Sequence, residues 1–207
     1  MKIAVFVSGG GTNLQAIIDN TKDGILKDIE IVLVLSSSPT AYALKRAEEN
    51  NIPSAVMRAA DYPSREQWDA DVVERLKESG AELIVLAGYL SLLGPKTVSM
   101  YSNRIINIHP ALIPSFCGKG MYGIKPHIEA LARGVKVSGA TVHFVNENYD
   151  DGPILLQKSA EVLPDDTPET LQKRVMQECE WKILPKAIRL IADGKVSIEN
   201  NIAYVRE

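Results

Sequence analysis

Asn107, His109 and Asp150 are the side chains in this sequence whose types could carry out acid–base chemistry together. Asn107 and His109 are two residues apart in Arg104-Ile-Ile-Asn-Ile-His-Pro110, so an extended chain points both side chains to the same side. An amide beside an imidazole can donate hydrogen bonds to an oxygen that gains negative charge, and the imidazole can also transfer a proton. Since an isolated histidine is more often structural than catalytic, this interpretation requires a carboxylate that orients the ring.

A candidate for that carboxylate is Asp150, in the segment Glu147-Asn-Tyr-Asp-Asp-Gly152 between two expected strands. Asp150 and Asp151 stand immediately before Gly152-Pro153, where Asp and Gly are also common for purely local reasons. The spacing alone does not decide whether this turn reaches His109. The sequence therefore leaves two interpretations of Asp150: the acid that orients the histidine, or a residue of an ordinary turn.

The other two histidines and both cysteines have simpler interpretations. His127 falls on an expected helix, where a surface or packing role is favoured, and His143 alternates within an expected strand, where it fits a core or surface position. Cys117 and Cys179 are far apart and share no metal-ligand spacing, so they favour free thiols in a reducing compartment over a disulfide scaffold.

The loop Ser8-Gly-Gly-Gly-Thr-Asn13 lies between an expected strand and an expected helix, where a helix N-terminus can bind phosphate. A dinucleotide site would require glycine at Leu14 and an acid near Ser36-Ser-Ser38, and a triphosphate loop would require Gly-Lys-Ser/Thr; all are missing. A cradle for a single phosphate fits, with Thr12 and Asn13 as added donors. A tight turn without a ligand remains the alternative.

The elements that would position these residues follow an alternating pattern. Strands are expected at residues 2–7, 29–35, 54–57, 82–87 and 104–107, with helices at 12–22, 40–50 and 64–79. Because helices of this length separate the strands, parallel pairing with right-handed crossovers is expected. The fold class predicted is α/β, with a Rossmann-like, mostly parallel sheet flanked by helices.

The pattern changes after residue 108. Prolines and glycines indicate that most of 109–124 is loop, followed by a short helix at 125–134. Strands at 139–146 and 153–161 predict a C-terminal antiparallel hairpin. A long helix should start at Thr167-Pro168, bend near Pro185 and end near Gly194, before a small terminal strand or hairpin. Without repeats or linkers, the sequence predicts one domain over residues 1–207.

Bulk properties restrict the class of protein. The chain has 207 residues and a formal net charge of −3, so the basic face of a nucleic-acid-binding protein is not expected. The apolar run after Met1-Lys2 is too short for a signal peptide, and Leu83–Leu93 is too short to cross a bilayer. These features predict a cytoplasmic protein that binds neither nucleic acid nor membrane.

Several motifs occur together in a fixed order over residues 2 to about 194: Ser8-Gly-Gly-Gly-Thr-Asn-Leu-Gln-Ala-Ile17, Leu86-Ala-Gly-Tyr89, Ile106-Asn-Ile-His-Pro-Ala-Leu-Ile-Pro114, Gly139-Ala-Thr-Val-His-Phe-Val145 and Asp150-Asp-Gly-Pro-Ile154. This set resembles the phosphoribosylglycinamide formyltransferase family, within the folate-dependent formyltransferases. The resemblance implies transfer of a formyl group from 10-formyltetrahydrofolate, the co-substrate, to the amine of glycinamide ribonucleotide in purine biosynthesis. It implies no metal and no covalent enzyme intermediate. We expect a monomer or a homodimer.

The resemblance also implies roles for individual residues. The catalytic residues would be His109, Asn107 beside it, and Asp150, the acid that sets the histidine's charge. The residues that bind the phosphoribosyl substrate would be Gly11, Thr12, Asn13 and, at the glycinamide end, Glu180. The folate side would be formed by Arg65, Leu90, Ser91, Leu92 and Leu93, with Asn107 reaching the folate as well.

The sequence departs from the family pattern in three places. Leu90-Ser91 stand where many members have Met-Arg, so an arginine contact to the folate is lost or replaced. One extra residue precedes Glu180, which puts a substrate contact by Gln177 in doubt. The loop after Pro114 is longer than in many relatives, and Cys117–His127 is expected to form a distinct flap.

Three other functions are alternatives to formyl transfer to glycinamide ribonucleotide. A formyltetrahydrofolate hydrolase would share the Asn-x-His and acid groups but would carry an extra N-terminal domain. A methionyl-tRNA formyltransferase would carry a further C-terminal nucleic-acid-binding domain, usually with a basic surface. A non-catalytic phosphoribosyl-binding module would explain the glycine loop, but not Asn107, His109 and Asp150 together.

Overall fold

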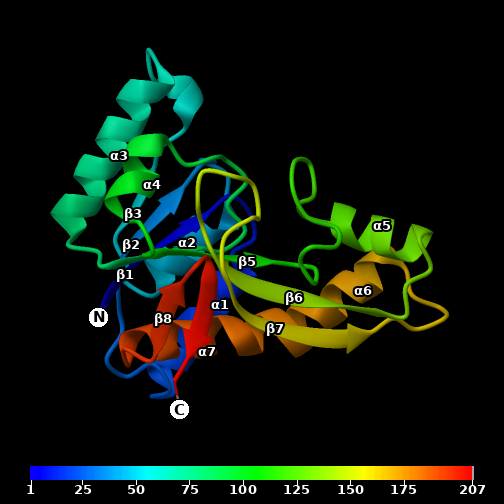
Figure 1. Cartoon of the computed structure of the whole chain (residues 1–207). Helices are drawn as coiled ribbons and strands as arrows, with labels where there is room; N and C mark the ends of the chain where they lie inside the picture. Colours follow the sequence, from blue (N-terminus) through cyan, green and yellow to red (C-terminus); the bar gives the residue numbers. More distant parts are fainter. Residues whose placement is uncertain (207) are drawn as a thin grey trace. The chain divides into compact units, whose positions relative to one another are not determined.

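The computed structural model describes residues 1–206, and seven strands form one sheet in the order β3-β2-β1-β4-β5-β6-β7 (Figure 1). A separate two-stranded sheet pairs β8 with β9. The strand bounds are β1 Lys2–Val7, β2 Glu30–Ser36, β3 Ser54–Val56, β4 Leu83–Leu86, β5 Ile105–His109, β6 Val137–Phe144, β7 Ile154–Glu161, β8 Val196–Glu199 and β9 Ile202–Val205.

The pairing follows from the connections between strands. β1 pairs in parallel with β2 and β4, and β2 pairs in parallel with β3, because each of these strands is followed by a helical crossover. β6 and β7 are joined by a loop and pair antiparallel. The prediction of an α/β fold with a mostly parallel sheet and an antiparallel hairpin is confirmed. β1 is the apolar centre of this arrangement, since Ile3 to Val7 are all 0% exposed.

The helices match the expected positions within a few residues. Their bounds are α1 Thr12–Lys22, α2 Tyr42–Glu49, α3 Arg65–Ser79, α4 Pro95–Met100, α5 Lys125–Ala132, α6 Pro168–Val175 and α7 Trp181–Ala192, with a 3-10 turn at Ala59–Asp61 and a π-helical segment at Met176–Glu180. Two details of the prediction are wrong. α4 has no counterpart among the expected elements, and β5 continues through His109 instead of ending at residue 107.

α4 starts where it does because of Asp69, a buried residue of α3. The Asp69 carboxylate accepts hydrogen bonds from the backbone N–H of Lys96 at 2.8 Å and of Thr97 at 3.1 Å, and from the Thr97 hydroxyl at 2.6 Å. These amides belong to the first turn of α4, which has no helical acceptor for them. A side chain at Gly94 would overlap this carboxylate, since its Cβ would lie 2.0 Å from Asp69 Cγ. A short segment without clear periodicity therefore becomes helical through a contact made by another helix.

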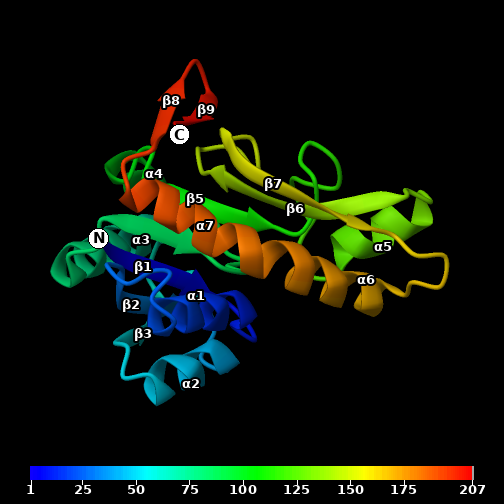
Figure 2. The ribbon, with the colours of Figure 1, turned by 90° about the horizontal axis from the view of Figure 1, so that it is seen from below.

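The long helix expected after Thr167 starts as predicted. Thr167 caps α6 in a capping box with Thr170, and Pro168 occupies the first turn. The irregularity lies at the π segment rather than near Pro185, which sits inside α7. Figure 2 shows α6, the π segment and α7 as one continuous run alongside β6 and β7.

The apolar positions of this run explain the π segment. Leu171, Val175, Cys179, Ile183 and Ala187 are all buried. These positions are four residues apart, whereas an α-helix has 3.6 residues per turn. In one continuous α-helix each successive position would therefore be rotated further around the helix axis, away from the face that the first ones bury. One wider turn absorbs an extra residue and restores the alignment. The sequence predicted the irregularity near Pro185 instead of at the π segment, because a proline is the stronger local indicator of a bend in a helix.

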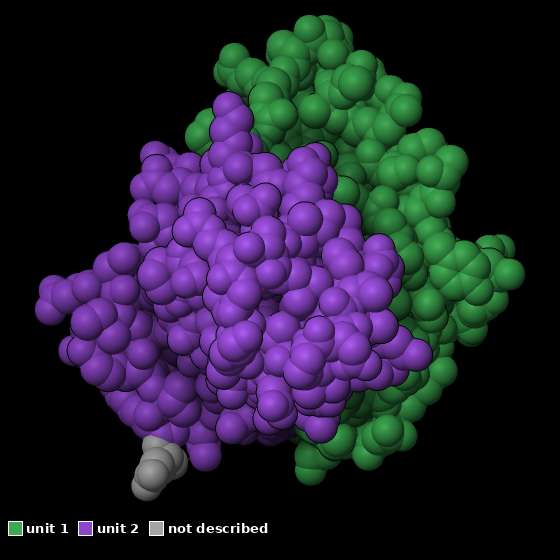
Figure 3. Space-filling view, turned by 90° about the vertical axis from the view of Figure 1, so that its right-hand side faces the viewer, with its two compact units in different colours: residues 1–106 green, residues 107–207 purple. Residues whose placement is uncertain are grey.

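The chain contains two compact units, residues 1–106 and 107–207 (Figure 3). The first holds β1 to β4, α1 to α4 and the glycine loop. The second holds the β6–β7 hairpin, α5 to α7 and the β8–β9 pair. The single domain expected over residues 1–207 stays a prediction.

Replacing Asp69 by alanine tests its structural role. The Asp69→Ala variant leaves the first amides of α4 without an acceptor, and we expect the free energy of unfolding to fall by about 1–3 kcal/mol. Urea denaturation followed by circular dichroism measures the loss. Asp71→Ala is the matched control, because within residues 1–206 the Asp71 carboxylate accepts a hydrogen bond from the Gln67 side chain of the same helix and from no backbone amide of α4. A change below about 0.5 kcal/mol is expected there. Equal effects of both variants would contradict the capping role.

Candidate active site

Asn107 and His109 lie on β5 and, being two residues apart, point to the same side of the strand. His109 is 4% exposed, and its Nε2 is 2.9 Å from the carbonyl oxygen of Phe116. A carbonyl oxygen can only accept, so His109 Nε2 carries the hydrogen of this bond. In the neutral ring Nδ1 is then unprotonated, and it lies 3.7 Å from Asp150 Oδ2.

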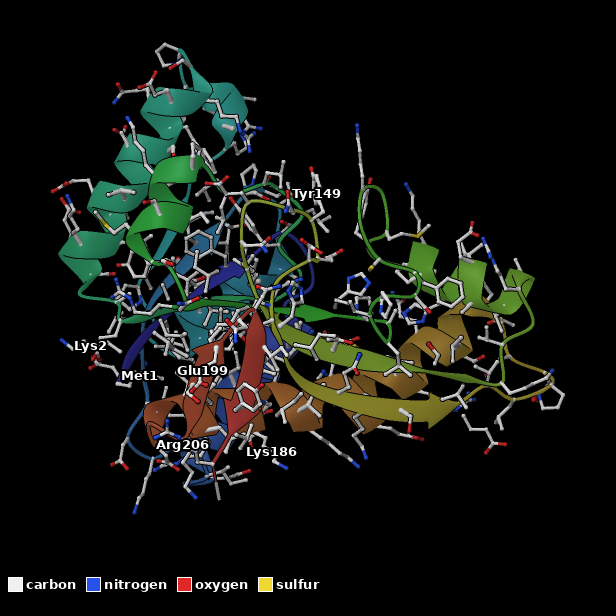
Figure 4. All side chains as sticks on the ribbon, viewed as in Figure 1. Met1, Lys2, Tyr149, Lys186, Glu199 and Arg206 are labelled. Atoms are coloured by element: carbon white, nitrogen blue, oxygen red, sulfur yellow. The ribbon has the colours of Figure 1, made fainter. Side chains whose placement is uncertain are left out.

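Asp150 reaches this histidine from the loop that joins β6 to β7. Its backbone has φ 51°, in the left-handed region, and its Oδ2 accepts a hydrogen bond from the Gly118 N–H at 2.8 Å. The chain can turn sharply here because Gly152 has no side chain: a Cβ there would lie 1.9 Å from the Phe144 carbonyl oxygen. The neighbouring Tyr149 is 49% exposed (Figure 4). The question that the spacing left open is answered, since the turn does bring Asp150 to His109.

His143 is a member of this group that the sequence interpretation did not select. It lies on β6 and is 2% exposed, and its Nδ1 donates to the Phe144 carbonyl oxygen at 2.8 Å. Its Nε2 is 3.1 Å from Asn107 Nδ2 and 3.5 Å from Asp150 Oδ1. In the neutral ring Nε2 accepts a hydrogen from the Asn107 amide, which fixes the direction of that NH₂ group.

A bulge explains why His143 points into the site. The β6–β7 register shifts between Val142 and His143, and such bulges redirect side chains, often near active sites. Regular alternation, which the sequence interpretation assumed, does not describe this end of the strand. His143 lies in Gly139-Ala-Thr-Val-His-Phe-Val145, one of the motifs that carry the family resemblance, and this was the available signal.

His127, by contrast, is a packing residue, as the sequence favoured. It is 0% exposed, and neither ring nitrogen has a hydrogen-bond partner within residues 1–206. Burial, with a smaller contribution from the charge of His109, lowers the pKa of His127 to about 4. Its ring is therefore neutral at physiological pH.

The charge state of His109 is set by two opposing effects. Burial lowers its pKa, while the Asp150 carboxylate and the hydrogen bond to Phe116 raise it, and the charge of His143 lowers it again. Burial is the largest effect, and the pKa lies below its ordinary value. Asp150 therefore acts in the expected direction, toward the charged ring, without overcoming the effect of burial.

Asp150 itself is held in its charged form. Burial alone would raise its pKa, but the neighbouring His143 and His109 rings, in their charged forms, and the Gly118 N–H together lower it. Cys117 lies on the loop beside this group, and burial raises the pKa of its thiol. A thiol with a raised pKa is a poor nucleophile, so the acid–base groups here are the two imidazoles and the carboxylate.

Glu180 also belongs to the second unit. It is the last residue of the π segment and is 7% exposed, whereas Gln177, three residues earlier, is exposed. The contacts of these two residues with a substrate stay predictions.

The glycine loop of the first unit has the backbone of an anion site. Gly11 is the N-cap of α1 with φ 69°, and no side chain caps the helix. The first turn of α1, which starts at Thr12 and Asn13, contains no acidic residue. A helix N-terminus without a side-chain cap or nearby acid favours an anion, as the sequence predicts for Gly11, Thr12 and Asn13.

The predicted folate wall, Leu90 to Leu93, is attached to the same unit at two points. The Leu90 N–H donates to Ser8 Oγ at 2.8 Å, and Arg65 Nη2 donates to the Leu92 carbonyl oxygen at 2.6 Å. Leu90 and Leu92 are nevertheless 56% and 43% exposed, so their side chains are available to an apolar partner. The Arg65 guanidinium also lies 5.3 Å from the Trp68 ring. Arg65 thus supports the backbone of the wall.

Comparisons with known proteins identify the family. The model of a family described as formyl transferase matches residues 1–188. Phosphoribosylglycinamide formyltransferase of Haemophilus influenzae is 37% identical over 204 residues, which cover 99% of this chain and 93% of that protein. The chain belongs to the formyl transferase family.

Other proteins similar to this chain carry equivalent names. The chloroplastic phosphoribosylglycinamide formyltransferase of Arabidopsis thaliana is 41% identical over 94% of this chain, which spans 66% of that protein's length. A glycinamide ribonucleotide transformylase of Symbiobacterium toebii has a TM-score of 0.93 at 42% identity, with 100% of this chain and 94% of that chain covered.

The fold is also shared with the hydrolase class. A formyltetrahydrofolate deformylase of Pseudomonas syringae has a TM-score of 0.87 at 28% identity, and the match covers all of this chain and 66% of that one. The fold alone therefore does not distinguish an enzyme whose formyl acceptor is an amine from one whose acceptor is water.

Two further observations concern metals and membranes. Residues 1–206 contain no cluster of three or more His, Cys, Asp or Glu side chains placed to hold a metal ion. No helix in the same range is long and apolar enough to span a bilayer. The expectations of no metal and no membrane partner stay predictions.

The Asp150→Asn variant of this formyl transferase tests the electrostatic coupling. The Asp150 carboxylate raises the pKa of His109, so its removal should lower that pKa further below the ordinary value of about 6.5. The dependence of kcat/KM on pH reports groups of the free enzyme, and its acidic inflection should move to lower pH in the variant. An inflection that stays in place or moves upward would show that Asp150 does not stabilise the charged ring.

His143→Leu tests whether His143 orients Asn107. Without the ring nitrogen the Asn107 amide loses its acceptor, and we expect kcat for formyl transfer to fall by about 10²-fold, as when an oxyanion donor is lost. Substrate KM should change much less. His127→Leu removes a buried histidine of the same unit that makes no hydrogen bond within residues 1–206, and kcat should stay within a few-fold. A full-rate His143→Leu enzyme would exclude this role.

Proposed function

We propose that this protein transfers the formyl group of 10-formyltetrahydrofolate to the amine of glycinamide ribonucleotide, giving formylglycinamide ribonucleotide and tetrahydrofolate. The observation that carries the proposal is the group formed by Asn107, His109, His143 and Asp150. It places an oriented amide donor and an imidazole together in a chain whose family transfers formyl groups. Such a set serves a reaction in which negative charge develops on a carbonyl oxygen.

The reaction would proceed by direct attack. The substrate amine attacks the formyl carbon, and the carbonyl oxygen of the tetrahedral intermediate gains negative charge. Asn107 would donate to this oxygen through the N–H that His143 does not use. His109 would donate from Nε2, which in this structure bonds the Phe116 carbonyl oxygen.

A neutral His109 is compatible with this role. The lowered pKa keeps the ring uncharged before reaction, and a neutral ring still donates from Nε2. When the oxygen gains charge beside it, the imidazolium form becomes more favourable, and Asp150 stabilises that form. The amine must lose one proton and the departing folate nitrogen must gain one. His109, or a water molecule, would carry that proton.

Binding would be divided among the remaining predicted residues. We assign the phosphate to the amides at Gly11, Thr12 and Asn13, which begin a helix without a side-chain cap. The exposed leucines of residues 90–93 would contact the folate, with Ser91 among them and Arg65 supporting the backbone. Glu180 would meet the amine end of the substrate.

The alternatives differ in the acceptor. A deformylase would use the same groups with water, and the shared fold makes this the nearest rival. A binding module would hold the phosphate without turnover. The relatives that share most of their length with this chain are named as transferases to phosphoribosylglycinamide, which favours the amine as acceptor. A cytoplasmic location and a monomeric or homodimeric state stay predictions.

A spectrophotometric assay with 10-formyltetrahydrofolate, run with and without glycinamide ribonucleotide, tests the proposal. We expect turnover only when the amine is present, and a His109→Ala enzyme about 10²–10³-fold slower because it lacks one oxyanion donor. Deformylation without the amine would identify a hydrolase. If His109→Ala lost no more than a few-fold in rate, the site assignment would be wrong.

A further inference from the structure

α2 is attached to the glycine loop by two hydrogen bonds to consecutive carbonyl oxygens. The Ala43 N–H donates to the Gly9 carbonyl at 3.1 Å, and Arg46 Nε donates to the Gly10 carbonyl at 2.9 Å. Arg46 Nη1 also donates to Gln15 Oε1 on α1 at 2.9 Å. One arginine therefore connects the loop, the helix that follows it and the helix that packs beside it.

These two bonds determine where the loop amides point. A peptide unit is planar and trans, so its N–H points opposite to its C=O. Because the carbonyls of Gly9 and Gly10 point toward α2, the N–H groups of Gly10 and Gly11 point away from it. Neither N–H donates to an acceptor in the part of the chain that the structure describes. Successive amides that point to one side form an anion-binding concavity.

Steric contacts reinforce this arrangement. Gly11 has φ 69°, and a Cβ on it would lie 2.6 Å from Ala43 Cβ and 3.3 Å from Arg46 Cδ. α2 therefore packs against the closed side of the loop. A Cβ on Gly9 or Gly10 would meet nothing within 4 Å, so the other side of the loop has room for a ligand.

Arg46 also brings positive charge to the loop. Its guanidinium lies 5.0 Å from the Tyr42 ring centre, so the ring supports it on one side. Within residues 1–206 its remaining terminal nitrogen, Nη2, makes no hydrogen bond. No acidic side chain is bonded to Arg46, so its charge is not neutralised by an ion pair there.

We propose that Arg46 is the positioning residue of the phosphate site: it holds the Gly10 peptide so that the loop amides face the phosphate, and its charge raises the affinity for that anion. This rests on the proposed function, in which the glycine loop binds the phosphate of the ribonucleotide. Arg46 acts through the loop rather than on the reacting atoms, so it sets substrate affinity and not the rate of the chemical step.

The test compares Arg46→Gln, Arg46→Lys and Lys45→Gln. Lys45→Gln is the matched control, because Lys45 is a cation on the same helix whose ammonium also lies near the Tyr42 ring, yet it pairs with Glu49 and makes no bond to the loop. For Arg46→Gln we expect the KM for glycinamide ribonucleotide to rise about tenfold or more, as when a hydrogen bond from a charged group is lost. The kcat and the KM for the folate should stay within about twofold.

Arg46→Lys separates geometry from charge. A lysine keeps the charge but lacks the planar fork that reaches both Gly10 and Gln15. We expect its KM to lie between those of the wild type and Arg46→Gln, and that of Lys45→Gln to match the wild type. An Arg46→Gln enzyme with an unchanged KM, or one in which kcat falls and KM does not, would overturn the proposal.

Inorganic phosphate provides a readout that does not depend on turnover. Phosphate should raise the melting temperature of the wild-type protein and of Lys45→Gln, but raise that of Arg46→Gln much less. If the wild type showed no amine-dependent turnover, the proposed function would fail, while the phosphate shifts would still test Arg46. If Arg46→Gln did not fold, Gln15→Met would replace it, because this variant removes one hydrogen-bond partner of Arg46 and leaves the arginine in place. Gln15→Met should raise the KM for glycinamide ribonucleotide, or reduce the stabilisation by phosphate, by less than is expected for Arg46→Gln. An equal phosphate shift in the folded variants would overturn the proposal.

Discussion

The partly buried carboxylate of Asp150 is the group on which the arrangement of the second unit depends. It lies 3.7 Å from His109 Nδ1 and 3.5 Å from His143 Nε2, and it accepts the Gly118 N–H. A buried charge is costly unless it has partners. The Gly118 N–H meets part of that requirement, and each imidazole attracts the carboxylate when it is protonated. His143 in turn contacts the Asn107 amide, which has no other side-chain partner within residues 1–206.

The first unit uses backbone groups where the second uses side chains. Its glycine loop and its exposed leucines are held by hydrogen bonds to side chains that lie elsewhere in the sequence. Arg46 donates to the Gly10 carbonyl, Ser8 Oγ accepts from the Leu90 N–H, and Arg65 donates to the Leu92 carbonyl. Each hydrogen bond fixes the orientation of one peptide plane.

The pKa values of His109 and Asp150 depend on a balance between burial and nearby charge. Burial lowers the pKa of His109 and would raise that of Asp150, whereas their mutual attraction acts in the opposite direction on each. The outcome differs because the partners of Asp150 together outweigh its burial, whereas for His109 burial outweighs Asp150 and the bond to Phe116. An uncharged imidazole beside a charged carboxylate results, ready to donate from Nε2 and to gain stabilisation when negative charge appears nearby.

The sequence by itself determined the parts that depend on local patterns. Short apolar runs with helical segments between them predicted β1 to β4 and their parallel pairing, and glycines and prolines predicted the long loop after His109. The Asn-x-His spacing predicted two side chains on one side of a strand. Tertiary structure decided what depends on distant partners. α4 starts at Pro95 because Asp69 caps it, and the π segment aligns Leu171 with Ile183. A bulge turns His143 toward Asn107, and Arg46 reaches the Gly10 carbonyl from the next helix. None of these contacts leaves a local signal, because each joins residues that only the folded chain brings together.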